Sequence, residues 1–129
     1  MIVLDTHIVI WLAESPELLS SVATEAIKVE RRDGVLAISD MTLLELARLI
    51  FSGKLEVRTP LSMFLQRVEQ SFKVLPVTSA IAEQAVLFSA DYPRDPVDRV
   101  IGATAVTHGC RLITKDRGIR QSNEVDCVW

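Results

Sequence analysis

Residues 2–14 read IVLDTHIVIWLAE, a short β-branched stretch followed by an acidic residue and then by a helical pattern. Ile2 to Leu4 have the composition of a buried strand, and the apolar residues from His7 to Glu14 recur at helical spacing. Parallel strands need a helix-length connection, so a strand that leads directly into a helix is typical of a parallel crossover. This stretch therefore predicts an α/β fold with Asp5 at the carboxyl end of its first strand.

The same alternation of strand and helix continues along the chain. Further β-branched runs predict four more strands, at Val35–Ile38, Val74–Val77, Leu112–Thr114 and Val125–Trp129. Helical patterns cover His7–Glu14, Glu17–Arg31, Met41–Phe51, Pro60–Phe72, Ser79–Tyr92 and Val97–His108. We expect a parallel sheet of about five strands flanked by helices in an α/β/α arrangement.

Several residues have the chemistry of helix ends. Thr59 is expected to cap a helix whose first residue is Pro60, and Gly53 and Gly109 suit helix C-termini.

Composition indicates one domain, residues 1–129, because no linker or repeat interrupts the sequence. The two cysteines, Cys110 and Cys127, lack the spacing of a metal or redox motif and are expected to be reduced core thiols. The apolar runs are too short to cross a bilayer, and Met1 to Leu4 lack the features of a leader peptide. We therefore expect a cytoplasmic protein with no membrane association.

Two aspartates follow predicted strands at the edge where open α/β sheets bind ligands. Asp5 follows the first strand, and Asp116 follows the strand at Leu112–Thr114. Each has an ordinary structural alternative, since Asp5 or Thr6 could cap the next helix and Asp116 could belong to a turn. Two carboxylates at one sheet edge repel each other unless a cation lies between them.

Two further acidic residues are candidates for the same site. Glu45 is the only acidic residue between Met41 and Gly53, although an ion pair with Arg48 would also explain it. Asp98 lies in the stretch Asp95–Arg99, where Asp95 is expected to cap a helix and Asp98 to occupy its first turn. Capping and the helix dipole could explain both of these aspartates. We interpret Asp95 as the cap and Asp98 as a ligand.

The charge and the donor types indicate a metal site. The formal net charge is −3, which argues against a simple basic nucleic-acid-binding module. Removing the four candidate acids from the 17 Asp and Glu leaves 13, against 14 Lys and Arg. Four oxygen donors without a Cys/His cluster suit Mg²⁺, or Mn²⁺, and the chemistry implied is metal-assisted hydrolysis of a phosphate ester. Thr114 could position the attacking water or a phosphate oxygen.

The ordered set of motifs resembles the PIN-domain family, specifically the VapC ribonuclease toxins of bacterial toxin-antitoxin pairs. The resemblance covers nearly the whole chain and rests on Leu4-Asp5-Thr6-His7 with Trp11, Glu45 followed by Gly53-Lys54-Leu55, Leu75-Pro76-Val77-Thr78, Asp95-Pro96-Val97-Asp98-Arg99, Leu112-Ile113-Thr114-Lys115-Asp116 and Val128-Trp129. Val97 departs from the pattern, since relatives often carry an aromatic residue between the acids.

The resemblance implies a PIN-like domain and Mg²⁺- or Mn²⁺-dependent endoribonuclease activity on RNA. It also implies a cognate antitoxin protein as inhibitor, a homodimer, and a catalytic and metal-binding set of Asp5, Glu45, Asp98 and Asp116. We expect Thr6, Thr114, Asp95 and Arg99 to support these acids or to position the substrate.

Other interpretations remain open. A PIN-like module could bind a partner without cutting RNA, and a Mg²⁺-dependent phosphatase-like hydrolase also places an aspartate after its first strand. The haloacid-dehalogenase-like pattern would have a second aspartate where this chain has His7. The sequence lacks the context for a Ser-His-Asp or Cys-His mechanism at His7 or His108. The basic residues near the acids, namely Arg94, Arg99, Lys115, Arg117 and Arg120, could hold RNA phosphates or be ordinary surface charges.

Overall fold

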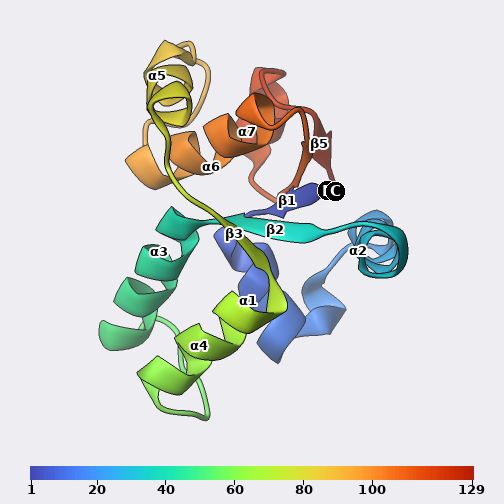
Figure 1. Ribbon diagram of the computed structural model, residues 1–129, viewed down its shortest axis with the longest axis vertical. Helices are drawn as coiled ribbons and strands as arrows, with labels where there is room; N and C mark the ends of the chain where they lie inside the picture. The colour runs from blue at the N-terminus through green and yellow to red at the C-terminus, as the bar shows by residue number, and fades with distance from the viewer.

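The computed structural model describes residues 1–129 and contains a five-stranded sheet in the order β3-β2-β1-β4-β5 (Figure 1). Every neighbouring pair is parallel. The strands are β1 (Ile2–Leu4), β2 (Leu36–Ser39), β3 (Lys73–Leu75), β4 (Arg111–Ile113) and β5 (Cys127–Val128). All five predicted strands exist, and β1 lies in the middle of the sheet because the chain adds β2 and β3 on one side of it and β4 and β5 on the other.

Helices cover both faces of this sheet, which confirms the α/β/α arrangement (Figure 1). They are α1 (Thr6–Glu14), the 3₁₀ helix η1 (Pro16–Leu18), α2 (Ser21–Asp33), α3 (Asp40–Phe51), α4 (Leu61–Ser71), α5 (Ser79–Leu87), α6 (Pro96–Thr107) and α7 (Arg117–Ser122). In the view of Figure 1, α1 and α4 lie below the sheet, and α5, α6 and α7 lie above it. None of the helices combines the length and apolar character needed to cross a bilayer.

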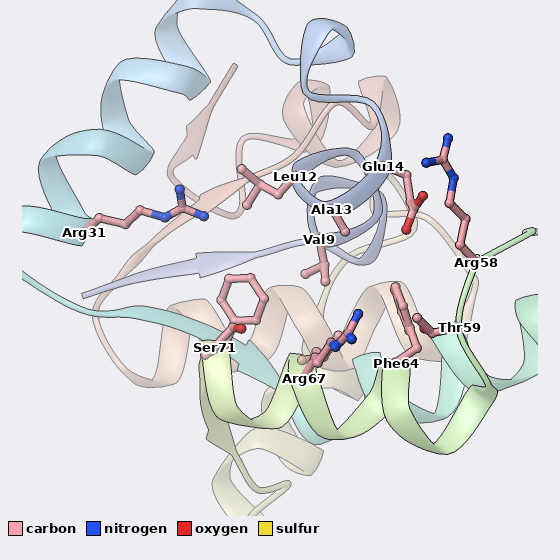
Figure 2. A pocket seen from close by; sticks show the side chains of 12 residues that line it. Val9, Leu12, Ala13, Glu14, Arg31, Arg58, Thr59, Phe64, Arg67 and Ser71 are labelled. Atoms are coloured by element: carbon pink, nitrogen blue, oxygen red, sulfur yellow. The ribbon is translucent and has the colours of Figure 1, made fainter.

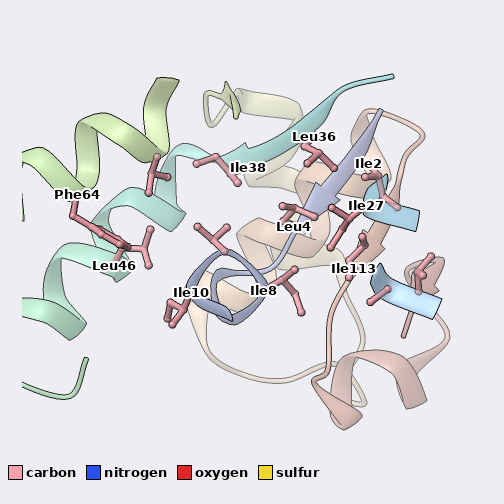
Figure 3. Packing of buried hydrophobic residues seen from close by; sticks show 14 residues of the cluster. Ile2, Leu4, Ile8, Ile10, Ile27, Leu36, Ile38, Leu46, Phe64 and Ile113 are labelled. Carbon is pink, nitrogen blue, oxygen red and sulfur yellow. The ribbon is translucent and has the colours of Figure 1, made fainter. Parts of the chain in front are cut away.

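Alternating strand residues face two separate cores, one on each side of the sheet. Ile2, Leu4 and Ile38 belong to a cluster of 14 buried residues that also includes side chains of α1, α2 and α4 (Figure 3). Val3 and Ala37 belong to a second cluster of 14, which includes side chains of α5, α6 and α7. Buried strands with both faces covered explain why these strands are apolar at nearly every position.

The two tryptophans and the two cysteines lie at the margins of these clusters. Trp11 and Trp129 pack against the first cluster, with their ring centroids 5.8 Å apart. Cys110 and Cys127 are free thiols that pack against the second cluster, as expected.

Some predicted helix boundaries were wrong. The expected helix Glu17–Arg31 is a 3₁₀ turn followed by α2, because Ser20 caps α2 by accepting a hydrogen bond from the Ala23 N–H at 3.0 Å. The expected helix Ser79–Tyr92 ends at Leu87, since Phe88 has a non-helical ψ of 139°.

Pro60 is the N-cap of α4, with a non-helical ψ of 147°, so it is not the first helical residue as predicted. The short helix α7 was not predicted at all. Gly53 and Gly109 have φ of 76° and 62° beyond the ends of α3 and α6, as helix-terminating glycines do.

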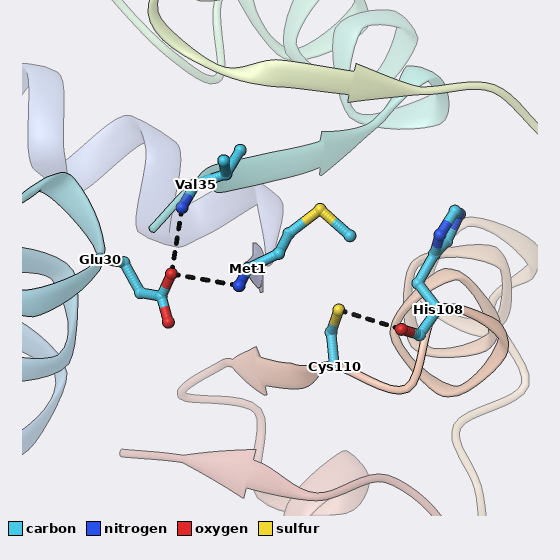
Figure 4. A network of polar contacts seen from close by, with 5 residues as sticks. All are labelled: Met1, Glu30, Val35, His108 and Cys110. Atoms are coloured by element: carbon cyan, nitrogen blue, oxygen red, sulfur yellow. Dashed lines mark hydrogen bonds and ion pairs between the residues drawn. The ribbon is translucent and has the colours of Figure 1, made fainter. Parts of the chain in front are cut away.

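Glu30 on α2 joins the amino ends of the two central strands. Its carboxylate accepts a hydrogen bond of 3.1 Å from the Val35 N–H and lies 3.2 Å from the Met1 amine (Figure 4). On the neighbouring crossover, the Cys110 thiol donates to the His108 carbonyl oxygen at 3.3 Å. These contacts tie α2 and the end of α6 to the sheet at the edge opposite Asp5, which follows the carboxyl end of β1.

Candidate active site at the carboxyl ends of the strands

A pocket of about 530 Å³ lies where β1 and β4 end and α1, α3 and α6 begin or pass. All four predicted site acids line it, together with Asp95. The full lining is Asp5, His7, Trp11, Glu45, Leu49, Asp95, Asp98, Lys115 and Asp116. The fold thus brings together carboxylates that are up to 111 residues apart in the sequence, counting from Asp5 to Asp116.

Asp5 is the most buried of these acids, with 6% of its surface exposed. Its Oδ1 accepts a hydrogen bond of 2.7 Å from the Thr6 N–H, and its Oδ2 accepts one of 2.6 Å from the Thr114 hydroxyl. Burial raises the pKa of Asp5, and the hydrogen bonds from Thr114 and Thr6 partly oppose that effect. Asp5 is therefore both the N-cap of α1 and a fixed carboxylate at the floor of the pocket.

Glu45 reaches the pocket from α3 and is partly buried. Burial, the largest influence, raises its pKa, and the negative charges of Asp5 and Asp95 act in the same direction. The alternative ion pair with Arg48 is absent, since the only two ion pairs of the protein are Met1–Glu30 and Arg32–Asp33. Thr6 is fully buried, and its Oγ1 makes no hydrogen bond.

Asp95 and Asp98 both lie at the start of α6, but only the Asp95 side chain makes hydrogen bonds there. Asp95 caps the helix, and its Oδ1 accepts hydrogen bonds from the Val97 N–H at 2.9 Å and the Asp98 N–H at 3.2 Å. The Asp98 side chain makes no hydrogen bond or ion pair. Its pKa is raised to about 7 by burial and, to a smaller extent, by the negative charges of Asp5, Asp95, Glu45 and Asp116.

Asp116 lies at the exit of β4 and is exposed. Its Oδ1 accepts a hydrogen bond of 2.8 Å from the Ile119 N–H and so caps α7, while Oδ2 is left free. The Thr114 hydroxyl also accepts a hydrogen bond of 3.0 Å from the Asp116 N–H. Because Thr114 donates to Asp5 as well, it fixes the two acids, and its hydroxyl hydrogen is not free for a water molecule.

Arg99, which was expected to support the acids or to position the substrate, does not line the pocket. Its five N–H groups donate to five main-chain carbonyl oxygens, at 3.0 to 3.4 Å, those of Pro93, Ala85, Phe88, Ser89 and Tyr92. The guanidinium therefore holds the connection between α5 and α6 and has no donor left for RNA. Among the basic residues named above, only Lys115 lines the pocket.

Three other lining residues, His7, Trp11 and Leu49, had no predicted role in the site. His7 and Trp11 are four residues apart on α1, a spacing that places side chains on one face of a helix. This spacing, directly after Asp5, is the sequence pattern from which a place for both residues beside the acids could have been predicted.

The pocket acids do not form a closed metal cage. No group of three or more His, Cys, Asp or Glu side chains is close enough to hold one ion together. The open acceptors are the carboxylates of Glu45 and Asp98 and one oxygen of Asp116, none of them in an ion pair. The arrangement is an open, strongly negative pocket with oxygen donors only, apart from the exposed His7 and Lys115.

A second hollow, of about 480 Å³, lies between α1, α2 and α4 (Figure 2). Its apolar lining includes Val9, Phe64 and Val68, and three arginines line it as well, namely Arg31, Arg58 and Arg67. Glu14 is its only acidic residue. This hollow lacks the groups needed for hydrolysis and has the character of a binding surface.

Comparison with known proteins identifies relatives over the full length of this fold. The model of the PIN domain family matches residues 2–124. Ribonuclease VapC22 from Mycobacterium tuberculosis is 36% identical over 119 residues, which is 92% of this chain and 89% of that protein.

Solved structures agree in fold at lower sequence identity. VapBC2 from Rickettsia felis, bound to a DNA fragment from its promoter, superposes with a TM-score of 0.74 at 14% identity, over 98% of this chain and 97% of that chain. A toxin-antitoxin complex from Klebsiella pneumoniae superposes with a TM-score of 0.69 at 22% identity, over 100% and 97%. Family match, sequence identity and fold together show that the chain belongs to the PIN domain family, in the group that includes ribonuclease VapC22.

Proposed function

We propose that the chain is a Mg²⁺- or Mn²⁺-dependent endoribonuclease and the toxin of a type II toxin-antitoxin pair. The observation that carries this proposal is the convergence of Asp5, Glu45, Asp98 and Asp116 on one pocket with no ion-pair partner, in a relative of ribonuclease VapC22. Uncompensated carboxylates around one pocket repel each other, and a bound cation offsets that cost. The substrate would be cytoplasmic RNA.

The donor set fits a hard divalent cation. Mg²⁺ keeps several water ligands and usually binds one or two carboxylates plus substrate phosphates, so it does not require three protein ligands at one point. The open oxygens of Glu45, Asp98 and Asp116 supply such donors, while Asp5 is fixed beneath them. When bound, the ion supplies polarisation of the scissile phosphate and a lower pKa for the attacking water.

The residues of the chain would share the remaining work. Asp5 is oriented by Thr114 and Thr6, and it stays aimed into the pocket because both oxygens accept short hydrogen bonds. Asp98 has a pKa of about 7 without a cation, so near neutral pH it is poised to lose a proton when positive charge arrives. Asp95 holds the first turn of α6, and with it Asp98, in place.

RNA cleavage by purified protein tests the proposal. A mixed RNA pool is incubated with Mg²⁺, Mn²⁺ or EDTA, and the cut ends are mapped. We expect cuts at defined sites with either ion and none in EDTA. Asp5→Asn, Glu45→Gln, Asp98→Asn and Asp116→Asn should each abolish most cleavage in folded protein, whereas the exposed Asp91→Asn control should not. Full activity of Asp5→Asn or Asp116→Asn would refute this centre.

The same experiment separates the alternatives. A non-catalytic PIN-like module would bind RNA or protein and leave the RNA intact under every condition. A phosphatase-like hydrolase would release phosphate from a monoester without cutting internal bonds. The PIN family assignment and the position of His7, where a second aspartate would be needed, favour the nuclease.

We further propose that the antitoxin occupies the arginine-lined hollow of Figure 2. Its apolar floor suits an amphipathic segment, and Arg31, Arg58 and Arg67 are free of ion pairs, so an acidic segment is complementary. With the co-expressed antitoxin, Arg31→Glu with Arg67→Glu should weaken complex formation by calorimetry. Arg48→Glu, outside the hollow on α3, should not.

A homodimer is the other proposed assembly. Large apolar side chains are exposed on α3, where Leu44 is 51% and Phe51 88% exposed, and on α5, where Val86 is 76% and Leu87 66% exposed. Exposed apolar patches commonly mark contacts between chains. Sedimentation at micromolar concentration should give a dimer, and a strict monomer would contradict this part of the proposal.

A further inference from the structure

One side of the pocket is lined by residues that the carboxylate chemistry does not use. These are His7 and Trp11 from α1, Leu49 from α3, and Lys115 from the segment after β4. The Lys115 ammonium lies over the Trp11 ring, 5.1 Å from its centroid. The His7 ring is 6.0 Å from the Trp11 ring with 56° between their planes.

We propose that this group recognises single-stranded RNA: Trp11, flanked by His7, stacks on a base next to the scissile phosphate, and Lys115 binds a phosphate of that nucleotide. This inference rests on the proposed ribonuclease function and adds the residues that hold the substrate.

The charge of the pocket makes a cationic contact necessary. Five carboxylates line it, and Lys115 is its only Lys or Arg. An RNA phosphate entering this field is repelled except where a positive group faces it. The Lys115 ammonium makes no hydrogen bond and no ion pair, even though Asp116 is its neighbour in sequence. Its three N–H donors are therefore available, and the Trp11 ring holds them at the pocket through a cation–π contact.

The position of Trp11 distinguishes it from the other tryptophan. Trp129 packs against the same core, 5.8 Å from Trp11, but lines a different hollow near the end of the chain. Trp11 is only partly buried and lines the carboxylate pocket itself. A large, partly exposed ring beside a phosphate-handling site matches the way proteins bind unpaired bases, by stacking them on aromatic side chains.

The secondary structure places this stacking surface beside the reactive centre. His7 and Trp11 are two and six residues beyond Asp5, and α1 starts at Thr6. The i,i+4 spacing puts both rings on the same face of α1. A duplex keeps its bases stacked on each other, so the arrangement selects RNA in which the base beside the cut is unpaired.

Tryptophan fluorescence tests the stacking directly. The chain has two tryptophans, so Trp129→Phe leaves Trp11 as the only one. This variant is titrated in EDTA, where the proposed metal-dependent cleavage does not take place, with a short RNA oligonucleotide and with the same oligonucleotide lacking one base. We expect strong quenching by the complete oligonucleotide and weaker quenching when the stacked base is absent. The matched variant Trp11→Phe, which reports Trp129, should respond much less. Equal responses from both tryptophans, or none from Trp11, would overturn the proposal.

Kinetics test the consequence for the reaction. Trp11→Leu should raise KM about tenfold, the typical effect of losing one base-stacking contact, with a smaller change in kcat. Trp11→Phe should restore most of the affinity, which a purely structural role would not require. Lys115→Met should reduce the slope of log KM against log salt concentration by about 1, the value for one phosphate contact. Lys28→Met, at an exposed position on α2, should leave this slope unchanged.

These outcomes separate two failures. If wild-type protein cleaves RNA and both Trp11→Leu and Lys115→Met keep the wild-type KM, the recognition surface is wrong and the nuclease stands. If no RNA is cut but Trp11 is still quenched by base-bearing oligonucleotides, the surface stands and the catalytic proposal fails. If Trp11→Leu does not fold, the KM of wild-type protein is compared between the complete substrate and the substrate lacking one base. Equal KM values would refute stacking.

Discussion

The Thr114 hydroxyl donates a 2.6 Å hydrogen bond to Asp5 Oδ2, joining residues 109 positions apart at the ends of adjacent parallel strands. The same hydroxyl accepts a 3.0 Å hydrogen bond from the Asp116 N–H. The buried Thr114 side chain thus orients the Asp5 carboxylate, and it also fixes the main chain at Asp116. Thr114 therefore links the positions of these two pocket acids.

We predict that Thr114→Val impairs both stability and cleavage. Valine keeps the shape but leaves Asp5 Oδ2 and the Asp116 N–H without partners, which should cost about 1–3 kcal/mol in urea unfolding. Cleavage should fall about 10- to 100-fold, as for other residues that orient ligands. Thr114→Ser should keep most of both, and the exposed Thr107→Val should change neither. An active, equally stable Thr114→Val protein would show that the hydroxyl is dispensable.

We predict that divalent ions stabilise the protein through the pocket acids. An ion that binds only the folded chain adds about 2.7 kcal/mol at 100 times its dissociation constant. The melting temperature of wild type should therefore rise with Mg²⁺ or Mn²⁺ and return with EDTA. Asp98→Asn should lose most of this response, whereas Asp91→Asn should retain it. An unchanged wild-type midpoint with both ions would contradict the metal site.

The raised pKa of Asp98 predicts a pH dependence of the metal-free protein. Its pKa is about 7 in the folded chain against an ordinary 3.8, so the folded state binds this proton more tightly than the unfolded state does. The resulting stabilisation is complete below about pH 4 and is lost as pH rises through 7. In EDTA, the Asp98 contribution should thus lower the melting temperature of wild type between pH 6 and pH 8.

Asp98→Asn removes that titration, so the decrease between pH 6 and pH 8 should be smaller in this variant. At pH 8 in EDTA it should melt above wild type while being inactive, a trade of function against stability. Identical pH profiles for the two proteins would contradict the raised pKa of Asp98.

The strands, and the position of Asp5 and Asp116 at one edge of the sheet, followed from local pattern and sheet topology, because the carboxyl ends of parallel strands lie at the same edge. Glu45 and Asp98 joined the expected set through the family resemblance, and the adjacency of β1 and β4 is a result of the structure. The helix α7 was missed because it has six residues and a single buried one, Ile119. It depends on the Asp116 cap and on burial of Ile119 in the second core, and both are tertiary effects.

The role of Arg99 shows a second limit of sequence analysis. An arginine one residue from a site acid has the pattern of a substrate ligand. Its partners, however, are one carbonyl oxygen in the last turn of α5 and four in the irregular segment after it, and no local pattern predicts where those carbonyls point. A helix running to Tyr92 would have bonded two of these carbonyls internally, those of Ala85 and Phe88, so the early end of α5 is what leaves them open to Arg99.

We predict that Arg99 acts on stability. Arg99→Lys keeps the charge but supplies three donors for five carbonyls, so it should cost at least about 1.5 kcal/mol in urea unfolding. If the side chain instead bound RNA, Arg99→Lys would leave stability unchanged and weaken RNA affinity. Arg94→Lys, at an exposed position nearby, is the matched control and should leave stability unchanged.

The last prediction concerns Gly102, which lets Tyr92 pack against α6. A Cβ at this position would overlap the Tyr92 hydroxyl oxygen and lie 2.8 Å from its Cζ. Tyr92 cannot move away freely, because its ring stacks on Phe88 at 4.1 Å and its hydroxyl donates to the Asp98 carbonyl oxygen at 3.1 Å. Gly102→Ala should therefore cost about 1–3 kcal/mol, the usual cost of overpacking a core.

Because that hydroxyl holds the Asp98 main chain, the strain in Gly102→Ala should also displace the first turn of α6 and lower the cleavage rate. Adding Tyr92→Phe removes the nearest atom of the overlap, so the double variant should recover part of the lost stability. It should not recover the cleavage rate, since the hydrogen bond to Asp98 is then absent as well. Urea unfolding and cleavage rates of Gly102→Ala, Tyr92→Phe and the double variant give the full cycle. Additive stability effects would show that the two residues do not interlock, and a Gly102→Ala protein as stable as wild type would show that Tyr92 has room to move.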